Sequence, residues 1–242
     1  MNIDEFILKF KEEAEKNEIT DIDNEKIKQL YDYMKNILKW NEVINLTAIK
    51  DENEFIMKHF IDSLTILKYI NENSKMIDIG TGAGFPGMPV KIVKPNLDIT
   101  LVDSVNKKIN VLKDIAEKMS IQKINIIHSR IEDIANQKEY REQFDYVTSR
   151  ALSNITTLSE YMLPFLKING KAICMKGPNF EEELENSKKA IDFLGGKIDK
   201  IDKLNINNEL ERNIIIIKKV KTTPKIYPRG KGKPLKEPLY FK

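Results

Sequence analysis

Residues 77–87 read Ile-Asp-Ile-Gly-Thr-Gly-Ala-Gly-Phe-Pro-Gly, an apolar strand that leads directly into a turn rich in glycine. Glycine in such a turn lets the backbone adopt positive φ and approach a ligand closely, because no Cβ stands in the way. The next predicted strand, residues 99–102, is followed by an acid. In nucleoside-binding α/β sheets an acid at this place receives the ribose hydroxyls. The two features together predict a site for an adenosine-type cofactor. The residues expected to form it are Gly80, Gly82, Gly84 and Asp103.

The composition is that of an ordinary water-soluble protein. The 242 residues are 41% hydrophobic and 32% charged, which is usual for a chain with a sizeable core. No run approaches the about 18 apolar residues that span a membrane, and the N-terminus has no signal-peptide pattern. The single cysteine, Cys174, excludes an internal disulfide and a zinc site built from several cysteines. We therefore expect a cytoplasmic protein with no membrane segment and no metal.

Positive charge is concentrated at the C-terminal end. Residues 218–242 hold nine Lys or Arg and one acid, so the rest of the chain is acidic although the net charge is +3. A basic segment on an acidic body suits a polyanion such as RNA or DNA, but a terminus that merely keeps the protein soluble explains the charges equally well. Prolines in this tail predict an extended conformation. They are Pro224, Pro228, Pro234 and Pro238.

The chain divides into three predicted regions. Residues 1–72 are expected to be helical, because apolar residues recur at i, i+3, i+4 and i+7 in two stretches. A third helix is predicted over 52–70. Residues 73–220 alternate short β-branched runs with amphipathic helices, and residues 221–242 are the basic tail that contains the prolines.

The middle region predicts a seven-stranded α/β sheet. Strands are expected at 76–79, 99–102, 124–127, 146–149, 171–175, 197–204 and 213–220. Helices are expected at 86–93, 106–119, 155–166 and 180–194. Strands separated by helices imply parallel crossovers, with helices on both faces of the sheet. Only a loop, residues 205–210, joins the last two strands, so we expect a terminal antiparallel hairpin on a mostly parallel sheet.

The glycine turn also matches the dinucleotide pattern GxGxxG, at residues 82–87. Three details oppose a nicotinamide dehydrogenase. The glycines begin earlier, at Gly80, and no sizeable substrate domain follows the sheet. Asp78 precedes the first glycine by two residues, where its carboxylate would repel a pyrophosphate. S-adenosylmethionine has no phosphate and carries a cationic amino group that such an acid can bind. A tight turn without a ligand is the remaining alternative.

A third cofactor cue follows the third strand, where residues 129–133 read Ser-Arg-Ile-Glu-Asp. In an adenosine site this turn lies beside the adenine ring. Ile131 is placed to cover one face of the ring, while Glu132 or Asp133 accepts its amine or a backbone N–H reads a ring nitrogen. The same acids also suit the first turn of a helix. Their position after the two earlier cues favours the adenine assignment.

The residues after the fourth strand bear on the methyl acceptor. Enzymes that methylate exocyclic amines place an Asn/Asp-Pro-Pro-aromatic turn there, whereas residues 148–152 read Thr-Ser-Arg-Ala-Leu. Methylation at cytosine C5 needs a cysteine nucleophile, but Cys174 falls inside an apolar strand and is expected to be a core thiol. A ring nitrogen with a free lone pair, such as guanine N7, fits what remains. It requires alignment and no general base, so no catalytic residue is nominated.

Two basic residues are expected near the acceptor. Arg150 follows the fourth strand, where it suits guanine O6, a phosphate or the cofactor pocket, or else forms an ordinary surface ion pair. Lys176 ends the fifth strand and is a candidate RNA contact.

Taken together, these residues resemble the bacterial small-subunit ribosomal RNA methyltransferase G family, first named glucose-inhibited division protein B. The resemblance covers nearly the whole chain, and the Phe-Pro-Gly ending of the glycine turn is its most specific part. Its other segments are 45–48 (Asn-Leu-Thr-Ala), 59–64 (His-Phe-Ile-Asp-Ser-Leu), 103–104, 149–151, 176–177 and the tail motif at 227–229. The resemblance implies a class I S-adenosylmethionine-dependent methyltransferase with a Rossmann-like sheet.

The resemblance also implies methyl transfer to N7 of a guanine in the 530 loop of 16S rRNA, with 16S rRNA or the small subunit as partner. We expect a monomer. The cofactor contacts that it implies, together with those derived above, are Asp78, Gly80, Gly82, Gly84, Phe85, Asp103, Ser104, Val105, Ile131, Glu132 and Arg150. The expected RNA contacts are Arg150, Lys176, Arg229, Lys231 and Lys233, with His59 either a packed histidine or a further contact.

Two alternatives remain open from the sequence. One is a methyltransferase that acts on another RNA site, a protein or a small molecule. The other is an RNA-binding or assembly protein that kept this fold without turnover. Binding of S-adenosylmethionine separates the second alternative from the enzymes, and identification of the methylated atom separates the enzymes from one another.

Overall fold

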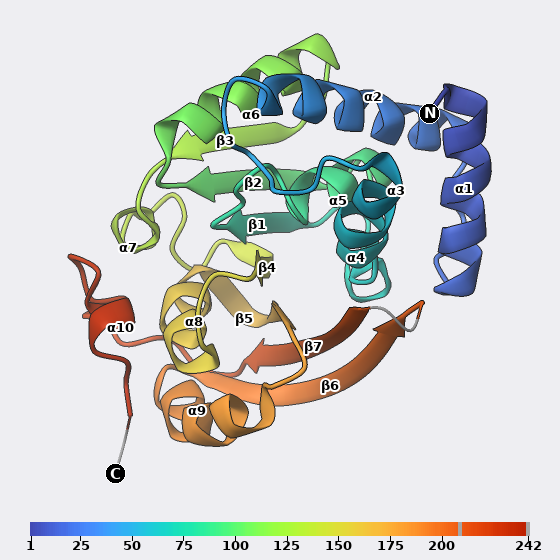
Figure 1. Ribbon diagram of the computed structural model, residues 1–242. Coiled ribbons are helices and arrows are strands. Elements are labelled where there is room, and N and C mark those ends of the chain that lie inside the picture. Colours follow the sequence, from blue (N-terminus) through green and yellow to red (C-terminus); the bar gives the residue numbers. More distant parts are fainter. Residues whose placement is uncertain (208–209, 241–242) are drawn as a thin grey trace.

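The computed structural model describes residues 1–207 and 210–240, and its centre is a seven-stranded sheet (Figure 1). The strand order is β3-β2-β1-β4-β5-β7-β6. The strands are β1 (Lys75–Ile79), β2 (Asp98–Asp103), β3 (Ile124–His128), β4 (Phe144–Arg150), β5 (Leu166–Lys176), β6 (Gly196–Ile206) and β7 (Leu210–Lys219). The pairs among β1 to β5 are all parallel. β7 inserts antiparallel between β5 and β6, so the predicted terminal hairpin is confirmed.

Helices cover both faces of the sheet. The α-helices are α1 (Ile3–Lys16), α2 (Asn24–Asn41), α3 (Glu52–Phe55), α4 (Asp62–Leu64), α5 (Gly87–Val93), α6 (Asn106–Lys118), α7 (Ile131–Ile134), α8 (Ile155–Met162), α9 (Glu181–Phe193) and α10 (Lys233–Lys236). Short π- and 3₁₀-helices are η1 (Ile56–Ile61), η2 (Leu67–Tyr69) and η3 (Leu163–Phe165). The predicted fold class, an α/β sheet preceded by helices, is confirmed.

The core consists of two apolar clusters, one on each face. The first joins the apolar stripes of α1 and α2 to α5, α6 and one side of β1 and β2. The second joins α8 and α9 to the opposite side of β1, β4, β5 and β7. Because side chains alternate across a strand, neighbouring residues such as Met76 and Ile77 enter different clusters. Fully buried aliphatic and aromatic residues of this kind each stabilise the fold by about 1.5–3 kcal/mol.

The predicted third helix is helical but interrupted. It is built from α3, η1 and α4, and it ends near Thr65, before the separate 3₁₀ turn η2. Residues 59–64 are all buried, so the second half of this segment has no solvent face to favour a regular amphipathic helix. π-Helical turns often occur at functional sites. Here the turn carries His59 just before Asp62, and both side chains meet Arg150.

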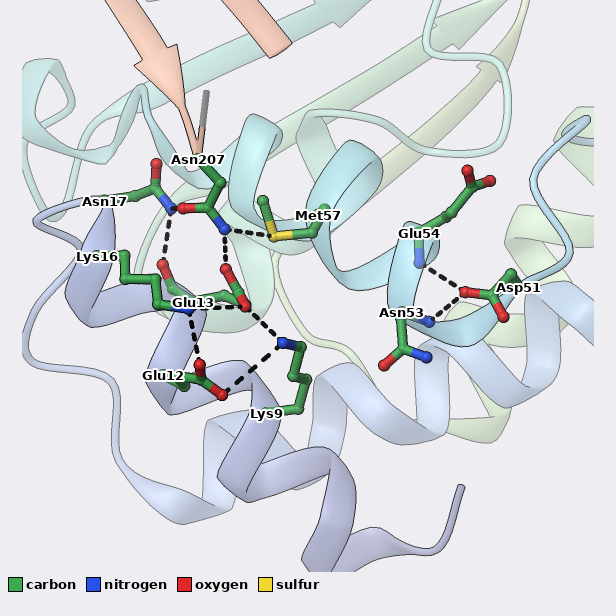
Figure 2. A network of polar contacts seen from close by, with 10 residues as sticks. All are labelled: Lys9, Glu12, Glu13, Lys16, Asn17, Asp51, Asn53, Glu54, Met57 and Asn207. Atoms are coloured by element: carbon green, nitrogen blue, oxygen red, sulfur yellow. Dashed lines mark hydrogen bonds and ion pairs between the residues drawn. The ribbon is translucent and has the colours of Figure 1, made fainter. Parts of the chain in front are cut away.

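The end of the β6–β7 hairpin is attached to the N-terminal helices (Figure 2). Asn207 donates from its side-chain amide to the buried carboxylate of Glu13. It also accepts from Asn17 Nδ2 at 3.0 Å and lies 3.4 Å from Met57 Sδ. Lys9 and Lys16 form ion pairs with the other oxygen of the Glu13 carboxylate. The first and last thirds of the chain therefore contact each other directly.

The C-terminal tail differs from the extended segment that its prolines predicted. It folds back on the body and contains the short helix α10, and the side chains of Tyr227 and Pro234 are buried. Arg141 binds the segment that precedes α10, donating to the carbonyls of Tyr227 (2.8 Å) and Thr223 (3.0 Å). Thr223 and Tyr227 each precede a proline, and their carbonyls are the acceptors that hold this part of the tail to the body.

Other differences are at element ends. β5 begins five residues earlier than predicted. The helix predicted at 155–166 ends earlier, because α8 stops at Met162 and Pro164 lies in the short 3₁₀-helix η3. The hairpin loop is shorter than predicted, and its residues 208 and 209 lie outside the described residues. Within the described parts of the chain, no helix is both long and apolar enough to cross a membrane.

Candidate functional site

A cavity of about 750 Å³ opens beyond the carboxyl ends of β1, β2 and β3. Ligands of open α/β sheets bind at this end, where the strand order reverses between β1 and β4, and this volume suits a small organic molecule. In Figure 1 the arrows of β1, β2 and β3 point toward α7 and α10. The lining residues are Gly80, Gly82, Asp103, Ser104, Lys108, His128, Ser129, Arg130, Ile131, Glu132, Asp133, Leu152, Ser153, Tyr161, Gly232 and Leu235.

The structure brings together part of the predicted cofactor set. The members that line the cavity are Gly80, Gly82, Asp103, Ser104, Ile131 and Glu132. The predicted residues that do not line it are Asp78, Gly84, Phe85, Val105, Arg150, Lys176, Arg229 and Lys231. The first group comes from the turns after β1, β2 and β3, which lie side by side because those strands are parallel neighbours.

The glycine turn exposes backbone to the cavity at Gly82. This residue has φ +59°, and a Cβ built on it would meet nothing within 4 Å, so its face toward the cavity is open. Gly84 has φ +83° for a different reason. A Cβ there would lie 2.2 Å from the Tyr33 hydroxyl, which donates to the carbonyl of Ala83 at 2.6 Å. Gly82 therefore serves the cavity, whereas Gly84 allows α2 to pack against the turn.

Asp103 lies at the mouth of the cavity and joins the first two strand ends. Its Oδ2 accepts from the backbone N–H of Gly82 and its Oδ1 from that of Val105, both at 2.8 Å. A carboxylate has about four acceptor positions, so two remain for a ligand. The predicted ribose contact is compatible with this geometry. Val105 contributes its backbone to the turn, and its side chain is exposed and does not line the cavity.

Asp78 lies beneath the turn, not in the cavity where we expected it to meet an amino group. Its Oδ2 accepts from Thr81 Oγ1 at 2.6 Å and from the backbone N–H of Gly87 at 3.0 Å. Its Oδ1 is buried without a hydrogen-bond partner among the described residues. Burial raises the pKa of this carboxyl to about 7, although both hydrogen bonds act in the opposite direction. Asp78 thus holds the two ends of the turn together.

Phe85, also predicted to contact the cofactor, lies outside the cavity lining. Its ring is buried among aromatic residues of the N-terminal helices, with Tyr33, Phe55 and Phe60 at edge-to-face angles. The His59 imidazole stacks on it at 4.2 Å between centroids. The ring therefore connects the helical region to the glycine turn and contributes no cavity wall.

His59 is a packed histidine. Arg150 Nη2 lies 3.2 Å from its Nδ1, and Thr47 Oγ1 lies 2.7 Å from its Nε2. Since a guanidinium only donates, Nδ1 is the acceptor and Nε2 carries the proton. Burial and the adjacent charge of Arg150 lower the pKa of His59 to about 3. The imidazole is therefore neutral at physiological pH.

Arg150 belongs to a buried cluster beside the cavity. Its guanidinium donates to Asp62 Oδ2 at 2.9 Å and to the carbonyl of Lys58 at 3.0 Å. Arg212 of β7 binds the same carboxylate through Nε (2.6 Å) and Nη2 (2.9 Å). Asp62 is completely buried. One carboxylate between two guanidinium groups leaves a local positive charge at the carboxyl end of β4.

The turn after β3 forms the far end of the cavity. Ile131 and Glu132 begin the short helix α7, so the acids stand in the first turn of a helix as well as beside the cavity. Glu132 is buried, and its Oε1 accepts from the backbone N–H of Gly232 at 2.9 Å. Asp133 is exposed at the cavity wall. An acid from the body and a backbone group from the tail thus meet here.

The remaining predicted basic contacts have protein partners in two cases. Lys176 pairs with Glu183 at 2.8 Å and donates to the carbonyl of Ser153 at 2.9 Å. Arg229 was expected to bind RNA phosphates, but its guanidinium binds Glu160, which is completely buried, at 2.8 and 2.9 Å. This ion pair occupies Nε and Nη2 of the guanidinium. Lys231 and Lys233 are both exposed.

The cysteine and the question of a metal site remain. Cys174 is buried in β5, and burial raises the pKa of its thiol to about 12, so the predicted core thiol is confirmed. Among residues 1–207 and 210–240, no cluster of three or more His, Cys, Asp or Glu side chains is arranged to hold a metal ion.

Several lining residues were missed by the sequence analysis. Leu152 and Ser153 follow β4 and could have been found by extending the strand-end rule by three residues. Lys108 and Tyr161 enter from helices, and nothing local in the sequence marks them. Gly232 and Leu235 come from the tail, about a hundred residues from the turn they contact. No sequence signal predicted that contact.

The comparisons with known proteins agree with this architecture. The family model described as rRNA small subunit methyltransferase G matches residues 26–215. A protein named Ribosomal RNA small subunit methyltransferase G from Clostridium novyi is 46% identical, over 93% of this chain and 94% of that protein. One of the same name from Clostridium botulinum (strain Eklund 17B) is 49% identical, over 85% and 87%.

Solved structures show the fold. A SAM-dependent methyltransferase from Aquifex aeolicus superposes with a TM-score of 0.50 and 16% identity, covering 69% of this chain and 93% of its own. A 16S rRNA (adenine(1408)-N(1))-methyltransferase from Catenulisporales acidiphilia gives 0.51 and 11%, covering 63% and 88%. These identities are too low to speak for substrates, whereas the curated relatives are similar over almost their full length. The chain therefore belongs to the rRNA small subunit methyltransferase G family.

Proposed function

We propose that this protein transfers the methyl group of S-adenosylmethionine to N7 of a guanine in the 530 loop of 16S rRNA. Membership of the family supports RNA of the small ribosomal subunit as the substrate. The observation that carries the cofactor assignment is the Asp103 carboxylate. It faces the cavity at the end of β2 while both oxygens keep acceptor positions for a ribose diol.

We infer one orientation of the cofactor in the cavity. The ribose lies at Asp103, the adenine lies by Ile131 and Glu132, and the methionyl part lies over the turn at Gly80 and Gly82. Hydroxyl groups donate to a carboxylate, and hydrogen bonds to a charged partner are the stronger kind. Asp78 acts indirectly in this scheme, by fixing the turn through Thr81 and Gly87.

The reaction needs no proton transfer from the protein. The sulfonium of S-adenosylmethionine supplies an activated methyl group when bound. Guanine N7 has a lone pair and no hydrogen, so the new N–CH₃ bond forms as the S–CH₃ bond breaks, and the positive charge moves to the base. The chain must align the two atoms and exclude water, which is worth many orders of magnitude in rate when the geometry is correct. We accordingly assign no catalytic acid or base.

The RNA approaches beside β4 and β5. Arg150 and Lys176 end these strands, and the cluster of Arg150, Asp62 and Arg212 provides positive charge there. On the tail, the exposed Lys231 and Lys233 suit phosphate groups, and Arg229 would contact one through the guanidinium nitrogen that Glu160 does not bind. Phosphate contacts of this type make binding depend on salt concentration. We expect a monomer that acts in the cytoplasm.

The test is methylation of small subunits from a strain that lacks this gene, with methyl-labelled S-adenosylmethionine. The RNA is digested to nucleosides, and the labelled product is identified by mass spectrometry. The proposal expects the label in 7-methylguanosine from the 530 loop. Label on an exocyclic amine, on a ribose, on protein, or in a different loop would overturn the assignment at that level. Binding of S-adenosylmethionine without any transfer would favour a non-catalytic RNA-binding protein.

A further inference from the structure

One wall of the cavity comes from the tail, outside the seven-stranded sheet. The segment is residues 229–236, here called the strap, and it follows the last strand, β7. Gly232 and Leu235 of the strap line the cavity together with the turn after β3. In Figure 1, α10 lies on the same side of the molecule as α7.

The strap is fixed to the body by buried contacts. Arg229 binds Glu160 of α8 through two nitrogens, at 2.9 and 2.8 Å, and its backbone N–H donates to the same carboxylate at 2.8 Å. Glu160 is completely buried. The carbonyl of Pro234 accepts from Thr157 Oγ1 at 2.9 Å, also on α8. A buried carboxylate left without its cation is costly, so the strap keeps this position.

The strap also orients a cavity carboxylate. The backbone N–H of Gly232 donates to Glu132 Oε1 at 2.9 Å, and Arg130 Nη1 lies 3.9 Å from the same oxygen. Neither contact uses Oε2. A carboxylate fixed through one oxygen presents the other in a single direction, which is what recognition of an amine requires.

Leu235 gives the strap an apolar side toward the cavity. Its side chain is 60% exposed although it lies on an anchored segment. Single exposed leucines are common, but this one lines a cavity whose only aliphatic side chains besides it, among the described residues, are Ile131 and Leu152. A flat, weakly polar group such as a purine ring would cover it.

We propose that the strap forms the adenine-binding wall of the cofactor site. Leu235 covers a face of the base, Glu132 accepts its exocyclic amine, and Arg229 is a positioning residue that acts through Gly232 and Glu132. The proposal rests on the proposed function, because it takes the ligand to be S-adenosylmethionine. It assigns to the tail a role in cofactor selection, where its charge alone suggests RNA binding.

The first experiment measures binding of S-adenosylhomocysteine to the full-length protein by calorimetry. Leu235→Ser should weaken binding about tenfold, since it removes most of one apolar contact. Ile226→Ser is the matched control, because Ile226 is 74% exposed on the same tail and does not line the cavity. It should bind as the wild type does. Equal affinity of Leu235→Ser and the wild type would overturn the proposal, and so would a loss confined to RNA binding.

The second experiment tests Arg229 through selectivity. The wild type should prefer S-adenosylhomocysteine over S-inosylhomocysteine, in which a carbonyl replaces the amine, by about tenfold or more. In Arg229→Met this ratio should fall toward one, and Arg229→Lys should restore part of it. A purely structural role would weaken both ligands equally and leave the ratio unchanged, which would overturn the positioning role. If Arg229→Met does not fold, the selectivity of Leu235→Ser and Glu132→Gln decides.

The two levels of the proposal fail differently. A wild-type protein that binds no S-adenosylhomocysteine contradicts the proposed function. A wild-type protein that binds it, with Leu235→Ser unaffected, contradicts only the role of the strap.

Discussion

The two walls of the cavity are made in different ways. The first wall consists of the turns after β1, β2 and β3, whose key contacts join a carboxylate to nearby backbone, as Asp103 does with Gly82 and Val105. The second wall depends on ion pairs between distant parts of the chain. In the strap, Arg229 pairs with Glu160, 69 residues away. A comparable distant pair outside the cavity lining joins Asp62 to Arg212, 150 residues apart, at the end of β4. Pairing of the parallel strands is enough to place the turns of the first wall side by side. The second wall forms only when the C-terminal tail has packed against α8.

This difference predicts how each wall responds to mutation. In the first wall, loss of one side chain removes hydrogen bonds to a few backbone N–H groups of neighbouring turns. Substitutions there should therefore affect ligand binding more than stability. A buried ion pair that loses one partner leaves an uncompensated charge. Substitutions in the distant pairs should therefore affect stability first.

The largest expected effect is that of Asp62→Ala. The change leaves Arg150 and Arg212 without their shared carboxylate, and it should lower the free energy of unfolding by about 3–5 kcal/mol, or the Tm by about 10 °C. Thermal unfolding measures it. Asp192→Ala is the control, because Asp192 is an exposed residue that pairs with Lys221, and surface pairs are worth less than about 1 kcal/mol. Equal Tm values for the two variants would contradict the comparison.

Asp103→Ala should have the next largest effect, on ligand binding. Loss of two hydrogen bonds from ribose hydroxyls to a carboxylate should weaken binding of S-adenosylmethionine about a hundredfold, while the protein remains folded. Calorimetry and circular dichroism measure the two quantities. Asp133→Ala removes an exposed acid from the same cavity and should change the affinity less than about twofold. An affinity unaltered by Asp103→Ala would mean that the ribose binds elsewhere.

Asp78→Asn should change how stability depends on pH. The pKa of Asp78 is raised to about 7 in the fold from the ordinary value of 3.8, so between these values the folded state binds a proton that the unfolded state has lost. Stability of the wild type must then fall as pH rises, by up to about 1.4 kcal/mol per pH unit. Relative to Asp78→Asn, the wild type should lose about 2 kcal/mol between pH 5 and pH 7. Urea unfolding at several pH values measures this difference.

His59→Gln provides the matched comparison with the opposite sign. The pKa of His59 is lowered from 6.5 to about 3, so the unfolded state binds the extra proton between these values. Relative to this variant, the wild type should gain stability as pH rises from 4 to 6. If both variants show the same sign, the assignment of the two buried groups is wrong.

The smallest expected effect is that of Cys174→Ala. The thiol is buried in β5, and its raised pKa, about 12, keeps it protonated. Methyl transfer by the variant should remain within about twofold of the wild type, because no covalent step uses the cysteine. A folded variant without activity would show that sulfur takes part in the chemistry.

The same contrast between the two walls explains what the sequence predicted. The seven strands and the first wall follow from local patterns: β-branched runs, glycines with positive φ, and acids at strand ends. Asp78 and Phe85 were expected to contact the cofactor, and the structure places both side chains outside the cavity lining, Asp78 under the turn and Phe85 against His59. Position along the chain predicts that a residue is near the turn, but not on which side of the turn its side chain lies.

The second wall was beyond such patterns. The strap is a run of Lys, Pro and Gly that read as an extended basic tail, and Arg229 as a phosphate contact. Its actual partner, Glu160, is on a helix that looks ordinary in the sequence. The π-helical turn that carries His59 lies in a segment where most side chains are buried. Both features depend on tertiary packing, which hydrophobic periodicity alone does not determine.

The central claim is that the cavity beside Asp103 holds an S-adenosyl nucleoside. A crystal structure with S-adenosylhomocysteine tests it most directly. The account predicts the ribose hydroxyls within hydrogen-bond distance of the Asp103 carboxylate and the adenine ring between Ile131 and Leu235. A nucleoside bound away from Asp103, or a cavity that stays empty at saturating ligand, would contradict it.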